Sequence, residues 1–328
     1  MTRQDSLTLK EILVPAIKKA GGWVNVHTHA DKAFTLNEEM LDIRKNCTLQ
    51  EKWDRLDRMR RESTEEDFYA SFSRFFEHMI AQGCTAVATC VDVEPSSGDR
   101  ALKAGIRARE HYKDQLTVKL VTQTLKGIIE PESRRWFELG AELGDIIGGV
   151  PMRDENDWGK GREAFDIMMT TAKEKGKYLQ LHVDQFNNSW EYETEMLCRK
   201  TIEYGMQGKV TAVHCISVGA HTKRYRERLY ALMKEAGVSA CCCATSWLDT
   251  RRTDRLAPWH NAITPVEEML PFGVNVCMGT DNVSDAMCLS GGDLWTELYM
   301  ICTACHYDNI EDLVNLATVN GRKSLGIE

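Results

Sequence analysis

The residues best suited to chemistry in this sequence begin with two histidines that are separated by one residue. His27 and His29 close the run Val24-Asn25-Val26. In an extended strand alternate side chains share a face, so both imidazoles point to one side and Thr28 points to the other. Two imidazoles on one face can hold a metal ion, although such a pair can equally be structural. The metal interpretation therefore needs further ligands.

Three later apolar runs each end in a group that can bind a metal. These groups are His182 after Leu181, His214 after Val213, and Asp281 after Gly279-Thr280. The carboxyl ends of the strands of a (β/α)8 barrel meet at one mouth. A barrel would therefore bring four histidines and one aspartate together, and we expect a metal centre at that mouth.

The barrel is predicted by the alternation of short apolar runs with amphipathic, charge-rich segments, the pattern of repeated βα units. We expect one domain over residues 1–328, an α/β fold of the (β/α)8 TIM barrel class with an N-terminal helix at Leu7–Ala20. The expected strands are Gly22–His27, Thr85–Val93, Leu116–Gln123, Asp145–Met152, Tyr178–Asp184, Val210–Ile216, Val238–Ala244 and Val274–Gly279. The expected helices are Leu49–Arg61, Glu65–Ala81, Gly98–Tyr112, Pro131–Leu143, Gly161–Lys175, Ser189–Gly205, Lys223–Ala236, Thr264–Leu270 and Ile310–Asn320.

Composition limits the binding partners and the cellular compartment that we expect for this protein. The formal net charge of −8 argues against nucleic acid or an anionic membrane, since both require a basic face. No apolar run approaches the roughly 20 residues that span a bilayer. The 12 cysteines include three in a row at 241–243, which fits buried thiols better than the disulfide framework of a secreted protein. We expect a cytoplasmic protein and leave its oligomeric state open, a homo-oligomer included.

The remaining histidines, and the cysteine next to His214, fit structural roles. Cys215 follows His214 directly, so in a strand it faces the opposite side and belongs to the core. The other histidines fall in predicted helices or loops, where we expect structural or solvated side chains: His78, His111, His221, His260 and His306.

These motifs resemble those of the amidohydrolase superfamily. The segments HTHADKAF (27–34), LHVDQ (181–185), VHC (213–215) and GTDN (279–282) follow the order and spacing of that family. The chain is similar to the cytosine deaminase branch, and especially to members that remove an alkylamine from a triazine ring. The resemblance runs from Gly22 to Ile327.

The resemblance implies one divalent metal ion per chain, held by His27, His29, His182 and Asp281. His214 would hold the attacking water, and Asp281 would also carry its proton. Three imidazoles and a carboxylate accept Zn²⁺ or Fe²⁺, and the segment 145–151 offers no lysine to bridge a second metal. The implied reaction is hydrolytic removal of ammonia or an alkylamine from a small nitrogen heterocycle.

Two positions depart from the family pattern. Gln185 stands where cytosine deaminases carry a proton-shuttling glutamate, and Asn282 stands where they carry a second aspartate. An amide can form hydrogen bonds but cannot transfer a proton near neutral pH, so cytosine is a poor candidate substrate. We expect both amides to contact substrate, together with Asp31, Lys32, Phe34 and Trp247.

Aromatic side chains after the strands could stack on a flat ring. Tryptophans on the helices of a barrel usually pack, so we expect only about one or two such residues in the pocket. The candidates are Phe34, Trp158, Trp190, Trp247 and Trp295.

Two other functions stay open. The same water could hydrolyse a cyclic amide or displace another leaving group from a heterocycle. Alternatively, Gln185 could mark a catalytically silent, metal-containing binding protein. Similar enzymes usually carry an accessory β-sandwich built from both ends of the chain; with only 26 residues before His27, we expect a barrel that lacks it.

Overall fold

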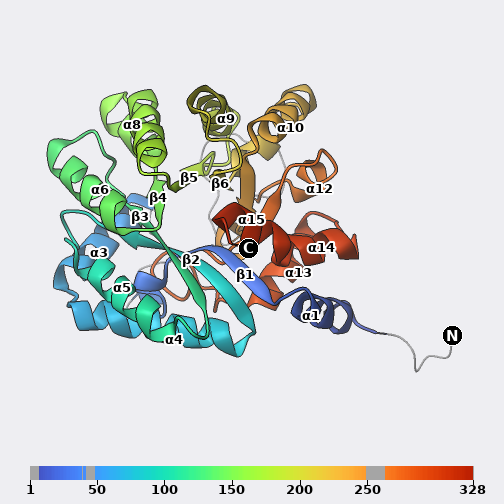
Figure 1. The fold of residues 1–328 in the computed structure, drawn as a ribbon, viewed down its shortest axis with the longest axis horizontal. Helices are drawn as coiled ribbons and strands as arrows, with labels where there is room; N and C mark the ends of the chain where they lie inside the picture. The colour runs from blue at the N-terminus through green and yellow to red at the C-terminus, as the bar shows by residue number, and fades with distance from the viewer. Residues whose placement is uncertain (1–6, 39, 42–48, 249–262, 328) are drawn as a thin grey trace.

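The strands of the protein form a barrel (Figure 1). The computed structural model describes residues 7–38, 40, 41, 49–248 and 263–327. Eight parallel strands form one sheet in chain order. They are β1 (Trp23–Thr28), β2 (Cys84–Asp92), β3 (Thr117–Gln123), β4 (Ile146–Gly149), β5 (Tyr178–Val183), β6 (Val210–His214), β7 (Ser239–Cys242) and β8 (Val276–Met278). A parallel bridge between Thr28 and Asp281 joins the two ends of the sheet. The predicted TIM barrel is confirmed, and these residues contain no second sheet.

Helices surround the barrel (Figure 1). The longer ones are α1 (Leu9–Lys19), α3 (Leu49–Glu62), α4 (Glu65–Ala81), α5 (Arg100–Tyr112), α6 (Pro131–Leu143), α8 (Gly161–Glu174), α9 (Glu193–Tyr204), α10 (Lys223–Ala236) and α13 (Leu294–Ala304). Shorter ones are η2 (Ala30–Lys32), α7 (Pro151–Trp158), η3 (Ile216–Ala220), α11 (Ala244–Leu248), α12 (Val266–Met269), α14 (Ile310–Ala317) and α15 (Val319–Leu325). Within the described residues, no helix is both long and apolar enough to cross a membrane.

Apolar side chains form two layers on either side of the sheet. On β2, Val87 and Val91 pack with the helices, whereas Ala88 and Cys90 face the barrel interior. This alternation is the period-two geometry of a strand. Leu325 of α15 joins the interior layer, so this last helix covers the interior at the end of the barrel away from the strand carboxyl ends.

Several element boundaries differ from those expected. β4 ends at Gly149 because Pro151 begins α7; a proline lacks the N–H that a strand ladder uses but that a first helical turn does not need. The expected helix Ile310–Asn320 breaks at Thr318, whose φ of −136° and ψ of −90° are not helical. The helix α13 has no counterpart among the predicted elements.

Candidate metal centre

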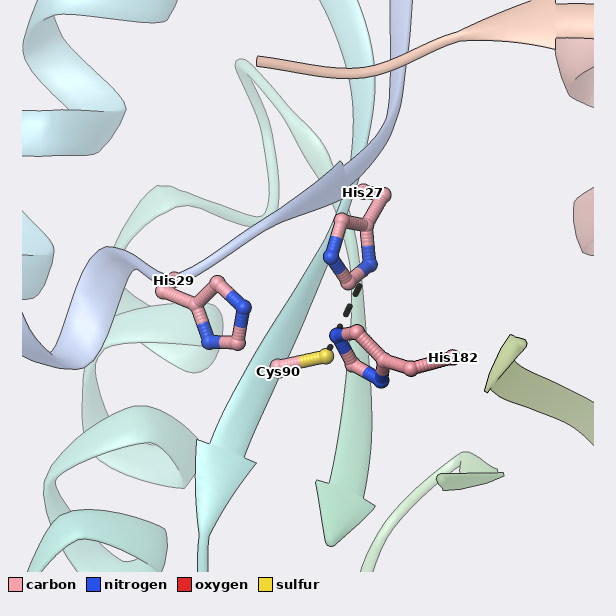
Figure 2. Close-up of side chains that lie close together, drawn as sticks. All are labelled: His27, His29, Cys90 and His182. Carbon is pink, nitrogen blue, oxygen red and sulfur yellow. Dashed lines mark hydrogen bonds between the residues drawn. The ribbon is translucent and has the colours of Figure 1, made fainter. Parts of the chain in front are cut away.

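The structure brings all five predicted centre residues together at the carboxyl end of the barrel. The ring of His27 has its centroid 5.1 Å from that of His29, 4.8 Å from that of His182 and 5.6 Å from that of His214. Candidate ligand atoms of His27, His214 and Asp281 lie within 4.8 Å of one another. Figure 2 shows three of these imidazoles side by side with Cys90. None of the five side chains is more than 6% exposed, so the cluster is buried.

A local irregularity aims the first histidine into the barrel. Val24 and Val26 already belong to the interior layer, so strict alternation would turn His27 outward. Between Asn25 and Thr28, however, β1 runs one residue longer than its pairing on β2. Such a bulge re-aims the side chains that follow it. The histidine pair therefore depends on this bulge as well as on its spacing.

Closure of the barrel places Asp281 beside His27 of β1 and His29, which follows this strand. The N–H of Asp281 donates to the carbonyl of His27 over 3.0 Å, and the N–H of His29 donates to the carbonyl of Asp281 over 3.3 Å. Gly279 permits this approach, because a Cβ there would lie 2.6 Å from the carbonyl oxygen of His27. As a result, Oδ1 of Asp281 lies 3.2 Å from Nε2 of His29 and 3.6 Å from Nε2 of His27.

Gln180 orients the ring of His27. The amide Nε2 of Gln180 donates to the carbonyl of Val26 over 3.0 Å, which fixes the amide so that its Oε1 lies 2.8 Å from Nδ1 of His27. Because a carbonyl oxygen only accepts, Nδ1 donates to it, and in the neutral ring Nε2 is bare. That Nε2 is buried and has no hydrogen-bond partner among the described residues. A bare, buried imidazole nitrogen is what a metal ion requires.

His182 and His29 meet different partners. Nδ1 of His182 lies 3.3 Å from the carbonyl of Gly149, so this ring also keeps its proton on Nδ1 and offers Nε2. Nδ1 of His29 lies 3.0 Å from Nζ of Lys32. An ammonium only donates, so it holds the ring proton of His29 on Nε2, facing Asp281. Metal binding through that Nε2 requires that this proton leaves.

Burial and mutual contact set the charges in the centre. Burial lowers the pKa of His29, holds the pKa of His182 well below its usual range, and lowers the pKa of His214 to about 3. Burial alone would raise the pKa of Asp281, but contacts with His27 and His29 hold it well below its usual range. At neutral pH the imidazoles of His29, His182 and His214 are therefore neutral and the carboxylate is charged. These are the states that bind a divalent ion.

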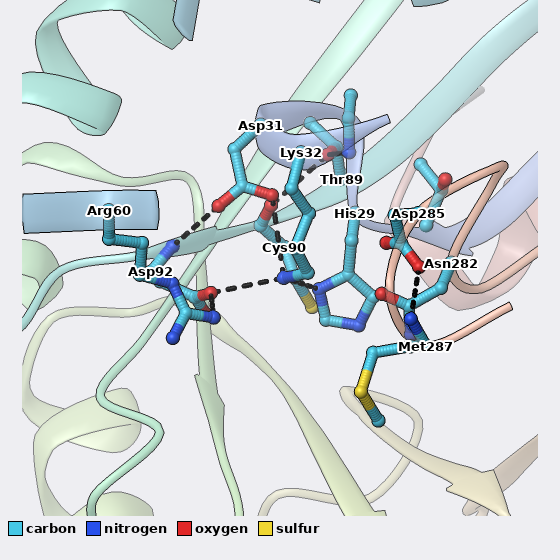
Figure 3. Close-up of polar contacts among 12 residues, drawn as sticks. His29, Asp31, Lys32, Arg60, Thr89, Cys90, Asp92, Asn282, Asp285 and Met287 are labelled. Atoms are coloured by element: carbon cyan, nitrogen blue, oxygen red, sulfur yellow. Dashed lines mark hydrogen bonds and ion pairs between the residues drawn. The ribbon is translucent and has the colours of Figure 1, made fainter. Parts of the chain in front are cut away.

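A buried network of ion pairs contacts Nδ1 of His29 through Lys32 (Figure 3). Nζ of Lys32 lies 3.0 Å from Oδ2 of Asp92 and 3.6 Å from Oδ1 of Asp31. Arg60 of α3 also pairs with Asp92. Asp31 and Lys32 are each only 2% exposed, so both predicted substrate-contacting residues are held within this network.

The other predicted substrate contacts lie in varied surroundings. Asn282 donates from Nδ2 to Oδ1 of Asp281 over 2.9 Å, and its own Oδ1 is buried without a partner among the described residues. Gln185 is 8% exposed at the end of β5. Phe34 packs against His78 and beneath the guanidinium of Arg74. Trp247 donates a hydrogen bond to His214.

Three of the other tryptophans and histidines can also be placed. Trp158 and Trp190 are 54% and 65% exposed. His221 is buried, and its ring lies against Tyr192 and Tyr225, which agrees with the structural role expected for it. His260 lies outside the described residues.

Two residues next to the centre have structural partners. Asp184 accepts from the N–H groups of Glu193 and Thr194 at the start of α9, so both of its oxygens cap that helix. Cys215 is buried in the outer layer, as expected.

Sequence reasoning did not single out Gln180 or Cys90 as neighbours of the centre. Gln180 precedes His182 by two residues on β5, so the same alternation that placed the histidine could have found it. Sγ of Cys90 lies 3.7 Å from Nδ1 of His27, the nitrogen that already meets Gln180. Burial raises the pKa of the Cys90 thiol well above its usual range, which favours the protonated thiol while no metal ion is bound.

Comparison with known proteins agrees with this geometry. The amidohydrolase family model matches residues 20–328. An uncharacterized protein from Haemophilus influenzae is 49% identical over 264 residues, which cover 80% of this chain and 96% of that protein. N-isopropylammelide isopropyl amidohydrolase from Pseudomonas sp. strain ADP is 24% identical over 80% of this chain, which spans 63% of that enzyme. The structure of 5-methylcytosine deaminase from Klebsiella pneumoniae matches with a TM-score of 0.86 and 25% identity over 93% of this chain and 74% of that one.

A (β/α)8 barrel with histidines and an aspartate at its mouth defines a metal-dependent hydrolase. The chain belongs to the amidohydrolase family, whose members hydrolyse carbon–nitrogen bonds. The resemblance stated from the sequence motifs is confirmed at this level, and relatives of the cytosine deaminase kind are among the matches.

Proposed function

We propose that the chain is an aminohydrolase that removes ammonia or an alkylamine from a nitrogen heterocycle. In this proposal His27, His29, His182 and Asp281 hold one divalent ion, Zn²⁺ or Fe²⁺, and His214 contacts the attacking water. The observation that carries the proposal is the position of the ionised Asp281 carboxylate between the imidazoles of His27 and His29. It lies next to the buried Nε2 of His27, which has no hydrogen-bond partner among the described residues.

The metal ion would supply one effect, the lowering of the pKa of a bound water towards about 7. The residues of the chain supply the proton transfers. Asp281 takes a proton from the water as its oxygen adds to the ring carbon that bears the amine. It then gives this proton to the departing nitrogen as the C–N bond breaks. The carboxylate of Asp281 is then free again and carries the remaining proton of the added hydroxyl to the adjacent ring nitrogen, so the products are an oxo ring and a free amine.

Two amides supply substrate contacts in this proposal. Asn282 has one side of its amide bound to Asp281, which leaves Oδ1 to accept a hydrogen bond from a ring or amine N–H. Gln185 can donate or accept but cannot shuttle a proton. The proton transfers therefore fall to Asp281 alone, because both oxygens of Asp184 cap α9.

The names of the relatives support the substrate class in this proposal. Proteins similar to this chain are named for action on N-isopropylammelide, on pterin and on 5-methylcytosine, which are all planar nitrogen rings with an exocyclic amine. We therefore propose a ring of this kind as substrate and leave its identity to experiment.

The test is a panel of aminated triazines, pyrimidines, pterins and imidazoles incubated with metal-loaded enzyme. We expect release of ammonia or alkylamine with an intact oxo ring, measured by amine assay and mass spectrometry. An Asp281→Asn protein prepared in the same way controls for contaminating deaminases. Ring opening with the exocyclic amine retained would instead support hydrolysis of a cyclic amide.

A catalytically silent binding protein is the second candidate, because Gln185 replaces the expected shuttle. The Gln185→Glu variant separates the two functions. An enzyme adapted to Gln185 loses turnover on its own substrate with this change, whereas a silent protein has no turnover to lose and gains deaminase activity if the shuttle was its only missing part.

A further inference from the structure

The indole of Trp247 makes a direct hydrogen bond to His214. Nε1 of Trp247 lies 2.8 Å from Nδ1 of His214, and the two rings meet edge to face with centroids 4.9 Å apart. Trp247 was expected to contact substrate, but this contact gives it a second role that depends on the chemistry of its N–H.

An indole N–H is only a donor, and it does not ionise at any pH at which proteins stay folded. Nδ1 of His214 must therefore accept, and in the neutral ring the proton resides on Nε2. Nδ1 of His29 also faces a donor, the Lys32 ammonium, so metal binding by His29 requires loss of its Nε2 proton.

The partners of the other histidines show the contrast. His27 faces the carbonyl oxygen of Gln180 and His182 faces the carbonyl of Gly149. Acceptors at Nδ1 leave Nε2 bare, which suits a metal ligand. A donor at Nδ1 leaves Nε2 protonated, which suits a hydrogen-bond donor.

Both partners are fixed in place. His214 adopts a φ of 80°, and its carbonyl accepts from the hydroxyl of Thr264 over 2.5 Å. Trp247 lies on α11, whose Thr245 is bound through its N–H to the buried carboxyl group of Glu297. Contacts with neighbouring segments therefore hold both residues of the pair in place.

We propose that Trp247 is a positioning residue that locks His214 in the tautomer with its proton on Nε2. His214 then donates to the oxygen of the attacking water and cannot serve as a ligand of a second metal ion. The inference rests on the proposed function for its catalytic meaning, but the tautomer itself can be measured without any substrate.

The experiment is nitrogen NMR of metal-free protein with 15N-labelled histidine, in which His214 is assigned from the spectrum of His214→Asn. At about pH 8, where an ordinary imidazole is neutral, we expect a protonated Nε2 and a bare Nδ1 for His214. In Trp247→Phe the two nitrogens should average between both tautomers. Replacement of Trp247 by its benzothienyl isostere, in which sulfur replaces the N–H, should give the same result with the ring shape retained.

Trp136→Phe is the matched control, because the Trp136 N–H has no hydrogen-bond partner among the described residues. It should leave the His214 signals unchanged. In turnover, the isostere should lower kcat about tenfold with little change in KM, the effect of one lost hydrogen bond.

The outcomes separate the two proposals. If wild-type His214 carries its proton on Nδ1, or if the isostere leaves the tautomer unchanged, the positioning role is wrong whatever the enzyme does. If the tautomer behaves as expected but no heterocycle is turned over, the proposed function is wrong. The positioning role of Trp247 is then still correct.

Discussion

The backbone N–H of Asp281 donates to the carbonyl oxygen of His27 over 3.0 Å. These residues are far apart in the sequence, and the hydrogen bond between them is part of the closure of the barrel. Asn25 stabilises the same closure of the barrel, because its Nδ2 donates to the hydroxyl of Thr280 over 2.9 Å. The candidate ligands from the first strand and from the end of the last strand are thus placed by the fold itself.

Asp281→Asn tests the two roles proposed for this carboxylate. The amide cannot carry a proton, so we expect turnover to fall by about 10²–10⁴-fold, the usual contribution of a general acid–base group. Substrate affinity should change far less. Steady-state kinetics on the best substrate of the panel, with metal content measured in parallel, gives both values. A variant with near-normal turnover would show that another group moves the proton.

His214→Asn should lower turnover while the protein keeps its metal ion, since His214 is proposed to contact water rather than the ion. Elemental analysis and kinetics on the same preparation check both points. His221→Asn is a suitable control, because it also removes a buried histidine, one that contacts Tyr192 and Tyr225 outside the centre. Loss of the metal from the His214 variant would make His214 a ligand.

Gln180→Leu removes the acceptor that keeps the proton of His27 on Nδ1. Residues that orient metal ligands typically contribute 10–100-fold to metal affinity, so we expect a loss of about that size in a competition titration with a chelator. Asn275→Leu is the control, since Asn275 also donates to a backbone carbonyl but lies just before β8. Equal metal affinity in wild type and Gln180→Leu would show that Gln180 does not contribute to metal binding.

Stability should depend on pH through Glu297. Burial raises the pKa of this carboxyl group from 4.5 to about 7, so between these values the folded protein binds more protons than the unfolded chain. The free energy of unfolding therefore falls as the pH rises through this window. Glu297→Gln cannot titrate, so the variant should gain stability relative to wild type between about pH 5 and pH 8. Urea unfolding of metal-free protein measures this difference, and a constant difference would show that Glu297 ionises normally.

Much of the fold could be predicted because it depends on local patterns. Alternation of apolar runs with amphipathic segments placed all eight strands, and the convergence of strand ends in a barrel brought His182 and Asp281 to one mouth. The boundary errors arose where one residue overrides a pattern. Pro151 starts a helix inside an expected strand, and Thr318 interrupts an expected helix.

The remaining features depend on contacts between distant segments. The bulge after Asn25 and the positive φ of His214 re-aim side chains, and neither conformation has a sequence signal here. Lys32 was expected to contact substrate, but it is buried because the carboxylates of Asp31 and Asp92 bring opposite charges to it. Strand alternation cannot reveal the pairing with Asp92, because it joins residues of different elements.

The most direct test of the central claim is the metal content of the protein after expression in metal-limited medium, with turnover measured before and after one divalent ion is restored. We expect one tightly bound ion per chain, no turnover without it, and loss of that ion when His27 is replaced by alanine. Two tightly bound ions per chain, or full activity with none, would contradict this claim.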